Sequence, residues 1–175
     1  MRDLCVFDLD GTLIAQDSFH QLVRSRIVAQ PELALWAIAR RLRVISRSTF
    51  AERAHRKLAG AVDPTSNPSI VTDIVSRILP ERGSLIRQWH DAGAYTVLLS
   101  ASPENYVSAV GKELGFDAAH GSHWHDGRYL HLHGESKRSF LETHYPASSW
   151  NRKYAIADSP SDEALLSCFE IAVRV

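Results

Sequence analysis

The chain has 175 residues and a mass of 19.6 kDa, the size of one domain or of one domain with a small insert. Its apolar fraction of 45% and charged fraction of 23% are those of an ordinary globular protein, which excludes a disordered chain, a fibrous repeat and a small disulfide scaffold. Twenty basic residues balance twenty acidic ones, so a globally basic nucleic-acid binder is not indicated.

The cellular environment is suggested by the cysteines and the N-terminus. Cys5 and Cys168 form no metal-binding spacing, and Cys5 lies in an apolar run where a buried, reduced thiol is expected. The N-terminus lacks the layout of a signal peptide, and no apolar stretch approaches the roughly 20 residues that span a bilayer. We therefore expect a cytoplasmic protein, a monomer or homodimer, without nucleic-acid partners or stable membrane insertion.

Four short apolar runs predict buried strands. They are Leu4–Phe7, Tyr95–Leu99, Tyr154–Ala157 and Phe169–Val173, and each of the first three stops at polar residues. Buried strands of this kind are typical of a parallel sheet that is covered on both faces.

Helical patterns lie between these runs. Pro80–Ala92 has apolar residues at helical spacing, and Pro103–Leu114 and Ser161–Cys168 follow the second and third strands. Gly93 and Gly115 follow the first two of these helices, and glycine commonly ends helices. A β-α-β-α order predicts a doubly wound α/β fold.

The stretch from Asp17 to about Leu79 breaks this order, with three helix-like segments and no clear strand. We predict a helical insertion over residues 15–79 within a core formed by residues 1–14 and 80–175. The insertion is basic: residues 15–60 hold nine Arg or Lys against three Asp or Glu, a net charge of +6 that leaves −6 for the remainder.

Polar residues follow the predicted strands where parallel strands place ligand sites. Asp8, Asp10, Ser100 and Asp158, together with Asp162, are expected to meet at the carboxyl edge of the sheet. Clustered carboxylates repel one another unless a cation lies among them, and oxygen ligands favour Mg²⁺ with a substrate phosphate. A carboxylate beside Mg²⁺ can also attack phosphorus and form an aspartyl phosphate.

Phosphoryl transfer depends on positioning and charge neutralisation, so a lysine and a hydroxyl group are expected on the phosphate oxygens. Lys137 and Ser100 are the candidates, with Lys112 and Lys153 as rival lysines.

These residues resemble the four motifs of the haloacid dehalogenase (HAD) superfamily. Asp8–Leu13 resembles motif one, and Leu98–Ser100 resembles motif two. Lys137 fits motif three, and Asp158–Asp162 resembles the Asp pair of motif four. A helical insert directly after motif one looks most like the phosphoserine-phosphatase-like subgroup. The resemblance implies a Rossmann-like three-layer α/β/α core with a parallel sheet and a small helical cap.

The resemblance also implies a role for each matching residue. Asp8 is the implied nucleophile, and Asp10 protonates the leaving oxygen and then deprotonates the attacking water. Asp158 ligates Mg²⁺ together with Asp8 and the Asp10 carbonyl, and Asp162 supports the site. The residues expected to contact substrate are Asp8, Asp10, Gly11, Asp17, Ser100, Ala101 and Lys137. After motif two, Ser102-Pro103 replaces the Gly-Gly-Phe type of sequence found in phosphoserine phosphatases, which argues against phosphoserine as the substrate.

Three features keep alternative interpretations. The five histidines from His120 to His133 indicate either a Zn²⁺ or Cu²⁺ site or a hairpin of exposed histidines turning at Asp126-Gly127, and we favour the hairpin. Asp17 either lines the substrate pocket or caps the next helix. The arginines of the insertion either attract an anionic substrate, touch anionic lipid, or form a solvated face; they include Arg40, Arg41, Arg43 and Arg47.

The sequence therefore predicts a Mg²⁺-dependent phosphomonoester hydrolase that acts on a small phosphorylated metabolite through a phospho-aspartate intermediate. One alternative is a phosphotransferase of the same fold. The other is a binding module without catalytic activity.

Overall fold

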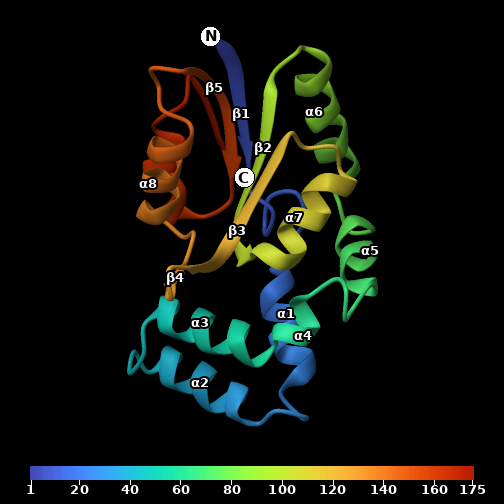
Figure 1. Ribbon diagram of the computed structural model, residues 1–175, viewed down its shortest axis with the longest axis vertical. Coiled ribbons are helices and arrows are strands. Elements are labelled where there is room, and N and C mark those ends of the chain that lie inside the picture. Colours follow the sequence, from blue (N-terminus) through green and yellow to red (C-terminus); the bar gives the residue numbers. More distant parts are fainter.

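A computed structural model describes all residues, 1–175, and has one six-stranded sheet at its centre (Figure 1). The strand order is β4-β3-β2-β1-β5-β6, and every neighbouring pair is parallel except β3 and β4. The predicted parallel α/β sheet is thus confirmed. The strands are β1 (Arg2–Phe7), β2 (Tyr95–Pro103), β3 (Ala118–His125), β4 (Arg128–Leu130), β5 (Trp150–Ala157) and β6 (Ile171–Arg174).

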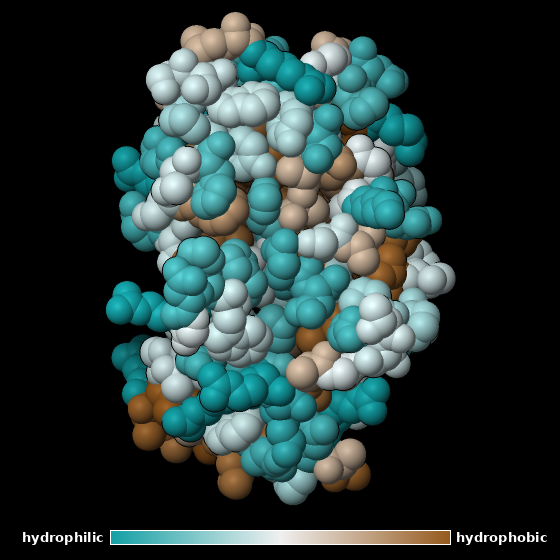
Figure 2. All heavy atoms as spheres, in the orientation of Figure 1, coloured by the Kyte–Doolittle hydropathy of each residue, from teal (hydrophilic) through white to brown (hydrophobic).

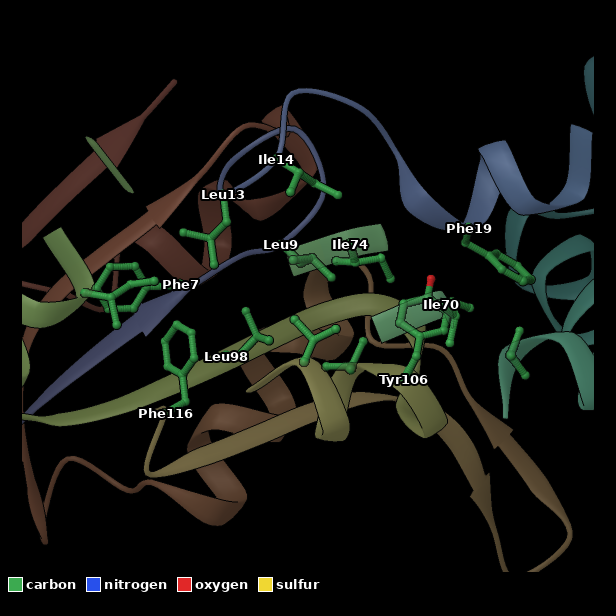
Figure 3. Close-up of a cluster of buried hydrophobic side chains, with 14 of the residues drawn as sticks. Phe7, Leu9, Leu13, Ile14, Phe19, Ile70, Ile74, Leu98, Tyr106 and Phe116 are labelled. Atoms are coloured by element: carbon green, nitrogen blue, oxygen red, sulfur yellow. The ribbon is translucent and has the colours of Figure 1, made fainter. Parts of the chain in front are cut away.

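The alternation of side chains along β1 explains the three layers. Leu4 and Val6 face a cluster formed with α8 (Glu135–His144) and α9 (Glu163–Leu166). Cys5 and Phe7 face the opposite cluster, formed with α6 (Pro80–Asp91) and α7 (Glu104–Glu113). Figure 3 shows Phe7 beside Phe116 in this second cluster, their ring centroids 5.5 Å apart. Both faces of the sheet are buried, as continuous apolar strands require.

The helix ends follow local chemistry. Pro80 begins α6, and Gly93, with φ of 81°, follows its C-terminal residues. Gly115, with φ of 78°, ends α7 in the same way. The predicted helix at Ser161–Cys168 is shorter, because a 3-10 turn (η1, Pro160–Asp162) precedes α9.

The region between β2 and α8 differs most from the sequence expectation. Strand β2 continues past Leu99 to Pro103, and β3 is an additional strand whose polar sequence gave no apolar run. Strands β3 and β4 pair as the hairpin expected at Asp126-Gly127. Both turn residues have positive φ, 47° and 75°, as a two-residue hairpin turn demands.

The segment between β1 and α6 holds five helices where three were expected. They are α1 (Ser18–Arg26), α2 (Glu32–Arg41), α3 (Arg47–Lys57), α4 (Ala59–Val62) and α5 (Ser69–Val75). Helices α1 to α4 extend beyond one end of the strands, whereas α5 lies beside α7 (Figure 1). None of the helices combines the length and the apolar character that a membrane-spanning helix needs.

The chain enters and leaves this helical segment at adjoining points. Ile14 forms a β-bridge with Ile78, and the Leu79 amide donates to the Leu13 carbonyl over 2.9 Å. Buried residues such as Phe19 and Leu58 belong to the same apolar cluster as Phe7. The helices are therefore packed continuously onto the sheet.

Candidate active site

The site begins where β1 and β5 end side by side. Asp8 follows β1 and Asp158 follows β5, at the point where the strand order reverses direction, which is where α/β sheets bind ligands. The turn after Asp8 passes through Gly11 with φ of 75°. A side chain on Gly11 would overlap the Asp158 carboxylate, so only glycine allows the turn to approach Asp158 this closely.

Lys137 joins two of the predicted carboxylates. It lies in the first turn of α8, is 2% exposed, and places Nζ 2.9 Å from Asp8 Oδ1 and 2.8 Å from Asp162 Oδ2. Burial lowers the pKa of Lys137, but Asp8 and Asp162 outweigh that effect and the net shift is upward. The lysine is therefore charged at neutral pH. The rival Lys153 pairs with Glu170 at the surface instead.

The carboxylates at this edge have too little positive charge around them. The pKa of Asp8 is raised to about 7, because burial, Asp162 and Asp10 raise it by more than Lys137 lowers it. Burial also raises the pKa of Asp10 and of Asp158. Lys137 contacts only Asp8 and Asp162, and a further cation at this edge would favour the ionised forms of Asp8, Asp10 and Asp158.

Asp10 is held by a hydrogen-bond network from three elements. Its Oδ1 accepts from the Ser18 amide over 2.6 Å, at the start of α1. Its Oδ2 accepts from Ser102 Oγ at 2.5 Å and from Ser100 Oγ at 3.4 Å. Ser18 Oγ in turn lies 3.0 Å from the buried Tyr106 hydroxyl. The Asp10 carboxylate is fixed in position before any ligand binds.

Ser102 is the residue of this network that the sequence analysis did not assign to the site. The sequence predicts a strand that ends at Leu99, which would leave Ser102 outside the site. The strand continues instead, and residues two apart on a strand share a face. Ser100 and Ser102 therefore both point toward Asp10.

The predicted site residues line one cavity of about 670 Å³ between the sheet edge and the helical segment. Asp17 lines it and also caps α1 by accepting from the His20 amide over 2.6 Å, so both interpretations of Asp17 apply. The cavity brings together every residue predicted to bind substrate or metal: Asp8, Asp10, Gly11, Asp17, Ser100, Ala101, Lys137, Asp158 and Asp162.

The prediction of exposed histidines is wrong for His131 and His133. His131 and His133 lie beyond β4 and are half-buried in the cavity wall, with ring centroids 5.4 Å apart, rather than exposed on a strand. Burial, together with the charges of His133 and Arg47, lowers the pKa of His131 to about 4. No three His, Cys, Asp or Glu side chains of the chain are grouped so as to hold a metal ion unaided. The histidines are neutral polar groups of the cavity.

Comparisons with known proteins concern the family and the fold of the chain. The family model of haloacid dehalogenase-like hydrolases matches residues 5–167. No curated protein matches the chain. A solved protein of unknown function from Bordetella pertussis Tohama I is 19% identical, with a TM-score of 0.74 over 96% of this chain and 87% of that one.

Two further solved structures share the fold. A HAD family hydrolase from Salmonella enterica serovar Typhi is 13% identical, with a TM-score of 0.70 over 98% of this chain and 62% of that one. A substrate-bound phosphoserine phosphatase is 18% identical, with a TM-score of 0.60 over 97% and 83% of the two chains. At these identities the likeness concerns the fold.

Proposed function

The chain belongs to the haloacid dehalogenase-like hydrolase family, and we propose that it is a Mg²⁺-dependent phosphomonoester hydrolase acting through a phospho-Asp8 intermediate on a small phosphorylated substrate. The observation that carries the proposal is the buried lysine, Lys137, held within 3 Å of both Asp8 and Asp162 beside the Asp158 carboxylate. That arrangement supplies a nucleophile, a fixed positive charge and further acidic oxygens in one cavity.

We also propose that residues 1–14 and 80–175 are the catalytic core and that residues 15–79 form a cap over the cavity. The adjoining entry and exit of the chain at Leu13 and Leu79 support this division. The cavity is lined from both sides, which is the arrangement expected of a site that a cap shields from water.

The donor set fits a hard divalent cation. All candidate ligands at the sheet edge are oxygen atoms, and burial without enough compensating charge raises the pKa of Asp8 and Asp158. The buried Asp162 Oδ1 has no hydrogen-bond partner, a further sign that positive charge or a polar ligand is missing nearby. Asp8, Asp158 and the Asp10 carbonyl are the proposed holders of Mg²⁺. Bound there, the ion offsets the charge of carboxylates and phosphate.

Asp8 has the geometry of a nucleophile. Lys137 contacts its Oδ1, which leaves Oδ2 to attack phosphorus. The new bond joins Asp8 to the phosphoryl group, and the ester oxygen of the substrate leaves with the electron pair of the broken bond. Lys137 and Ser100 are proposed to bind the phosphate oxygens during this transfer.

Asp10 is proposed to move the protons. Its raised pKa suits a carboxyl group that donates a proton to the leaving oxygen. The carboxylate that remains then takes a proton from the water that attacks phospho-Asp8, releasing phosphate and restoring Asp8. The hydrogen bonds from Ser102 and the Ser18 amide keep Asp10 oriented in both steps.

The test is phosphate release from a panel of phosphomonoesters, including phosphoserine, with Mg²⁺ and with excess chelator. Chelator-sensitive turnover that Asp8→Asn abolishes is the expected result. Turnover that persists in folded Asp8→Asn contradicts the covalent route. Adding alcohols as acceptors separates the hydrolase from a phosphotransferase, because a transferase yields the acceptor's phosphate ester.

A further inference from the structure

The wall of the cavity opposite Asp8 is made of arginines from three helices. Arg24 comes from α1, Arg40 and Arg41 from α2, and Arg47 from the start of α3. None of the four lies within 4.0 Å of a carboxylate oxygen. Four positive charges therefore face the cavity without a negative partner.

The helical segment cannot neutralise these arginines itself. Residues 15–60 contain only three acidic side chains, and Glu32 already pairs with Lys57 and Glu52 with Arg56. The third, Asp17, caps α1 by accepting from the His20 amide. The acidic residues of the segment thus pair with Arg56 and Lys57 or cap a helix, and none is left to pair with the four arginines that line the cavity.

Two of the arginines are already oriented by neutral neighbours. Arg47 Nη1 lies 3.0 Å from His133 Nε2, across the cavity from the sheet side, and Arg40 lies over the Phe50 ring at 6.0 Å from its centroid. Contacts of this kind hold a guanidinium group in place without cancelling its charge.

Resting on the proposed function, we propose that the substrate carries a second phosphate group, bound by this arginine wall while the first is cleaved at Asp8. A single carboxylate offers one negative charge and two acceptor atoms, too few for four guanidinium groups. A phosphate offers more oxygens and matches the planar guanidinium donors in bidentate fashion. The cavity volume of about 670 Å³ is large enough for a molecule with an anionic group at each end.

Direct binding tests this without requiring turnover. Calorimetry with Mg²⁺ compares methylphosphonate with α,ω-alkane bisphosphonates of increasing chain length, because the length sets the distance between the two anions. At least one bisphosphonate is expected to bind more than about tenfold tighter than methylphosphonate. The double variant Arg40→Gln/Arg47→Gln loses this advantage, and Arg53→Gln, on α3 but outside the cavity, keeps it.

Each other outcome overturns the inference. No advantage at any length means that the wall does not bind a second phosphate, and an advantage that survives in Arg40→Gln/Arg47→Gln means that other residues bind it. Hydrolysis of p-nitrophenyl phosphate is measured separately. Its presence together with a failed bisphosphonate test keeps the proposed function and rejects the arginine wall as an anion site.

A different surface, the outer face of α2, leads to a second inference. The inner face of this helix packs onto the protein through Leu33 and Trp36, yet Leu35 and Ile38 on the outer face are 65% and 55% exposed. Leu42, one turn on, is 68% exposed and continues the same stripe. A helix that is apolar on both faces is normally covered on both. Apolar spheres gather at this end of the molecule in Figure 2.

The charge around this stripe indicates what covers it. The exposed Arg43 follows Leu42 at the end of this stripe, and residues 15–60 carry a net charge of +6. A second copy of the chain would bring the same positive charge against it, whereas anionic lipid head groups would complement it. We propose that the α2 stripe docks the protein peripherally on an anionic bilayer surface, with its apolar side chains at the head-group boundary.

Sedimentation with vesicles tests the docking. The protein is expected to sediment with phosphatidylglycerol/phosphatidylcholine vesicles and not with phosphatidylcholine alone. Leu35→Ser/Ile38→Ser lowers the bound fraction about tenfold, while Ile171→Ser, an exposed apolar residue on β6, leaves it unchanged. Equal binding by wild type and the double variant, or no binding to anionic vesicles, contradicts the proposal. A dimer in size-exclusion chromatography that Leu35→Ser/Ile38→Ser breaks would assign the stripe to a second copy instead.

Discussion

The two ends of the cavity hold their charges in opposite ways. At the sheet edge, Asp8, Lys137 and Asp162 are buried and joined by contacts of 2.8 and 2.9 Å. At the helical wall, Arg24 and Arg47 are exposed and have no carboxylate partner. Charges that are removed from water must be compensated by neighbours within the fold, whereas charges that stay hydrated need no such partner.

The difference matches the two tasks that the proposed reaction sets. Bond breaking needs reacting groups placed within a fraction of an ångström. Asp8, Lys137 and Asp162, which we call the floor of the cavity, are therefore held by their contacts before substrate arrives. Recognition of a distal anion needs available charge, which hydrated arginines supply. Substitutions at the two ends should therefore differ in kind, and the following predictions run from the largest expected effect to the smallest.

Asp8→Asn should lower kcat by at least about 10³-fold, because the amide is a poor nucleophile and no other carboxylate replaces it. The fold should remain, since the change is nearly isosteric and removes a charge that burial disfavours. Steady-state hydrolysis of p-nitrophenyl phosphate and circular dichroism check both parts. A folded variant with wild-type kcat would remove Asp8 from the mechanism.

Lys137→Met tests the compensation at the floor directly. It leaves Asp8 and Asp162 buried without their cation, and the free energy of unfolding should fall by about 3–5 kcal/mol in urea titrations. Arg40→Met at the wall should change it by less than about 0.5 kcal/mol, because no ion pair is lost. Equal losses of unfolding free energy in Lys137→Met and Arg40→Met would contradict the difference between the sheet edge and the arginine wall.

Gly11→Ala tests how closely the turn must approach Asp158. The new side chain meets the Asp158 carboxylate and has to adopt a positive φ, so the two elements must move apart. A loss of about 10²-fold in kcat/KM is expected from the displaced carboxylate. Gly60→Ala is the matched control, because no atom lies within 4 Å of the added side chain. A similar loss of kcat/KM in the control would contradict the explanation by close approach to Asp158.

The pH dependence of stability should show the buried neutral histidine. His131 has a folded-state pKa near 4 against 6.5 for the ordinary side chain, so below pH 6.5 the unfolded chain binds a proton that the folded chain does not. Stability contributed by neutral His131 is complete above about pH 7.5 and is lost as pH falls toward 4. His131→Asn should reduce the loss between pH 7.5 and 5.5 by at most about 1 kcal/mol, since the ring is only half-buried. Urea unfolding of both proteins at the two pH values measures this difference. An equal loss of unfolding free energy in wild type and His131→Asn would contradict the prediction.

The sequence predicted the floor of the cavity better than its walls. Asp8, Ser100 and Asp158 directly follow apolar runs of the sequence, and the sheet architecture brings such positions to one edge. The hairpin turn at Asp126-Gly127 was also predictable, because few residue pairs accept positive φ at both positions.

The remaining features depend on contacts that are distant in sequence. β3 is a strand because it pairs with β2, although its own residues are polar. Ser102 joins the site only because β2 continues past the expected end. His131 and His133 are half-buried, and the helical segment contacts His133 through Arg47, which no local pattern indicates.

The measurement that tests the central claim most directly is chemical quench of a reacting Asp10→Asn variant, followed by mass spectrometry of its peptides. With p-nitrophenyl phosphate the leaving group needs no proton, so the first transfer proceeds while hydrolysis of the intermediate is slowed. The account predicts a phosphoryl group on the peptide that contains Asp8, formed only with Mg²⁺. Release of p-nitrophenol without any labelled Asp8 peptide, or with the label on another residue, would contradict it.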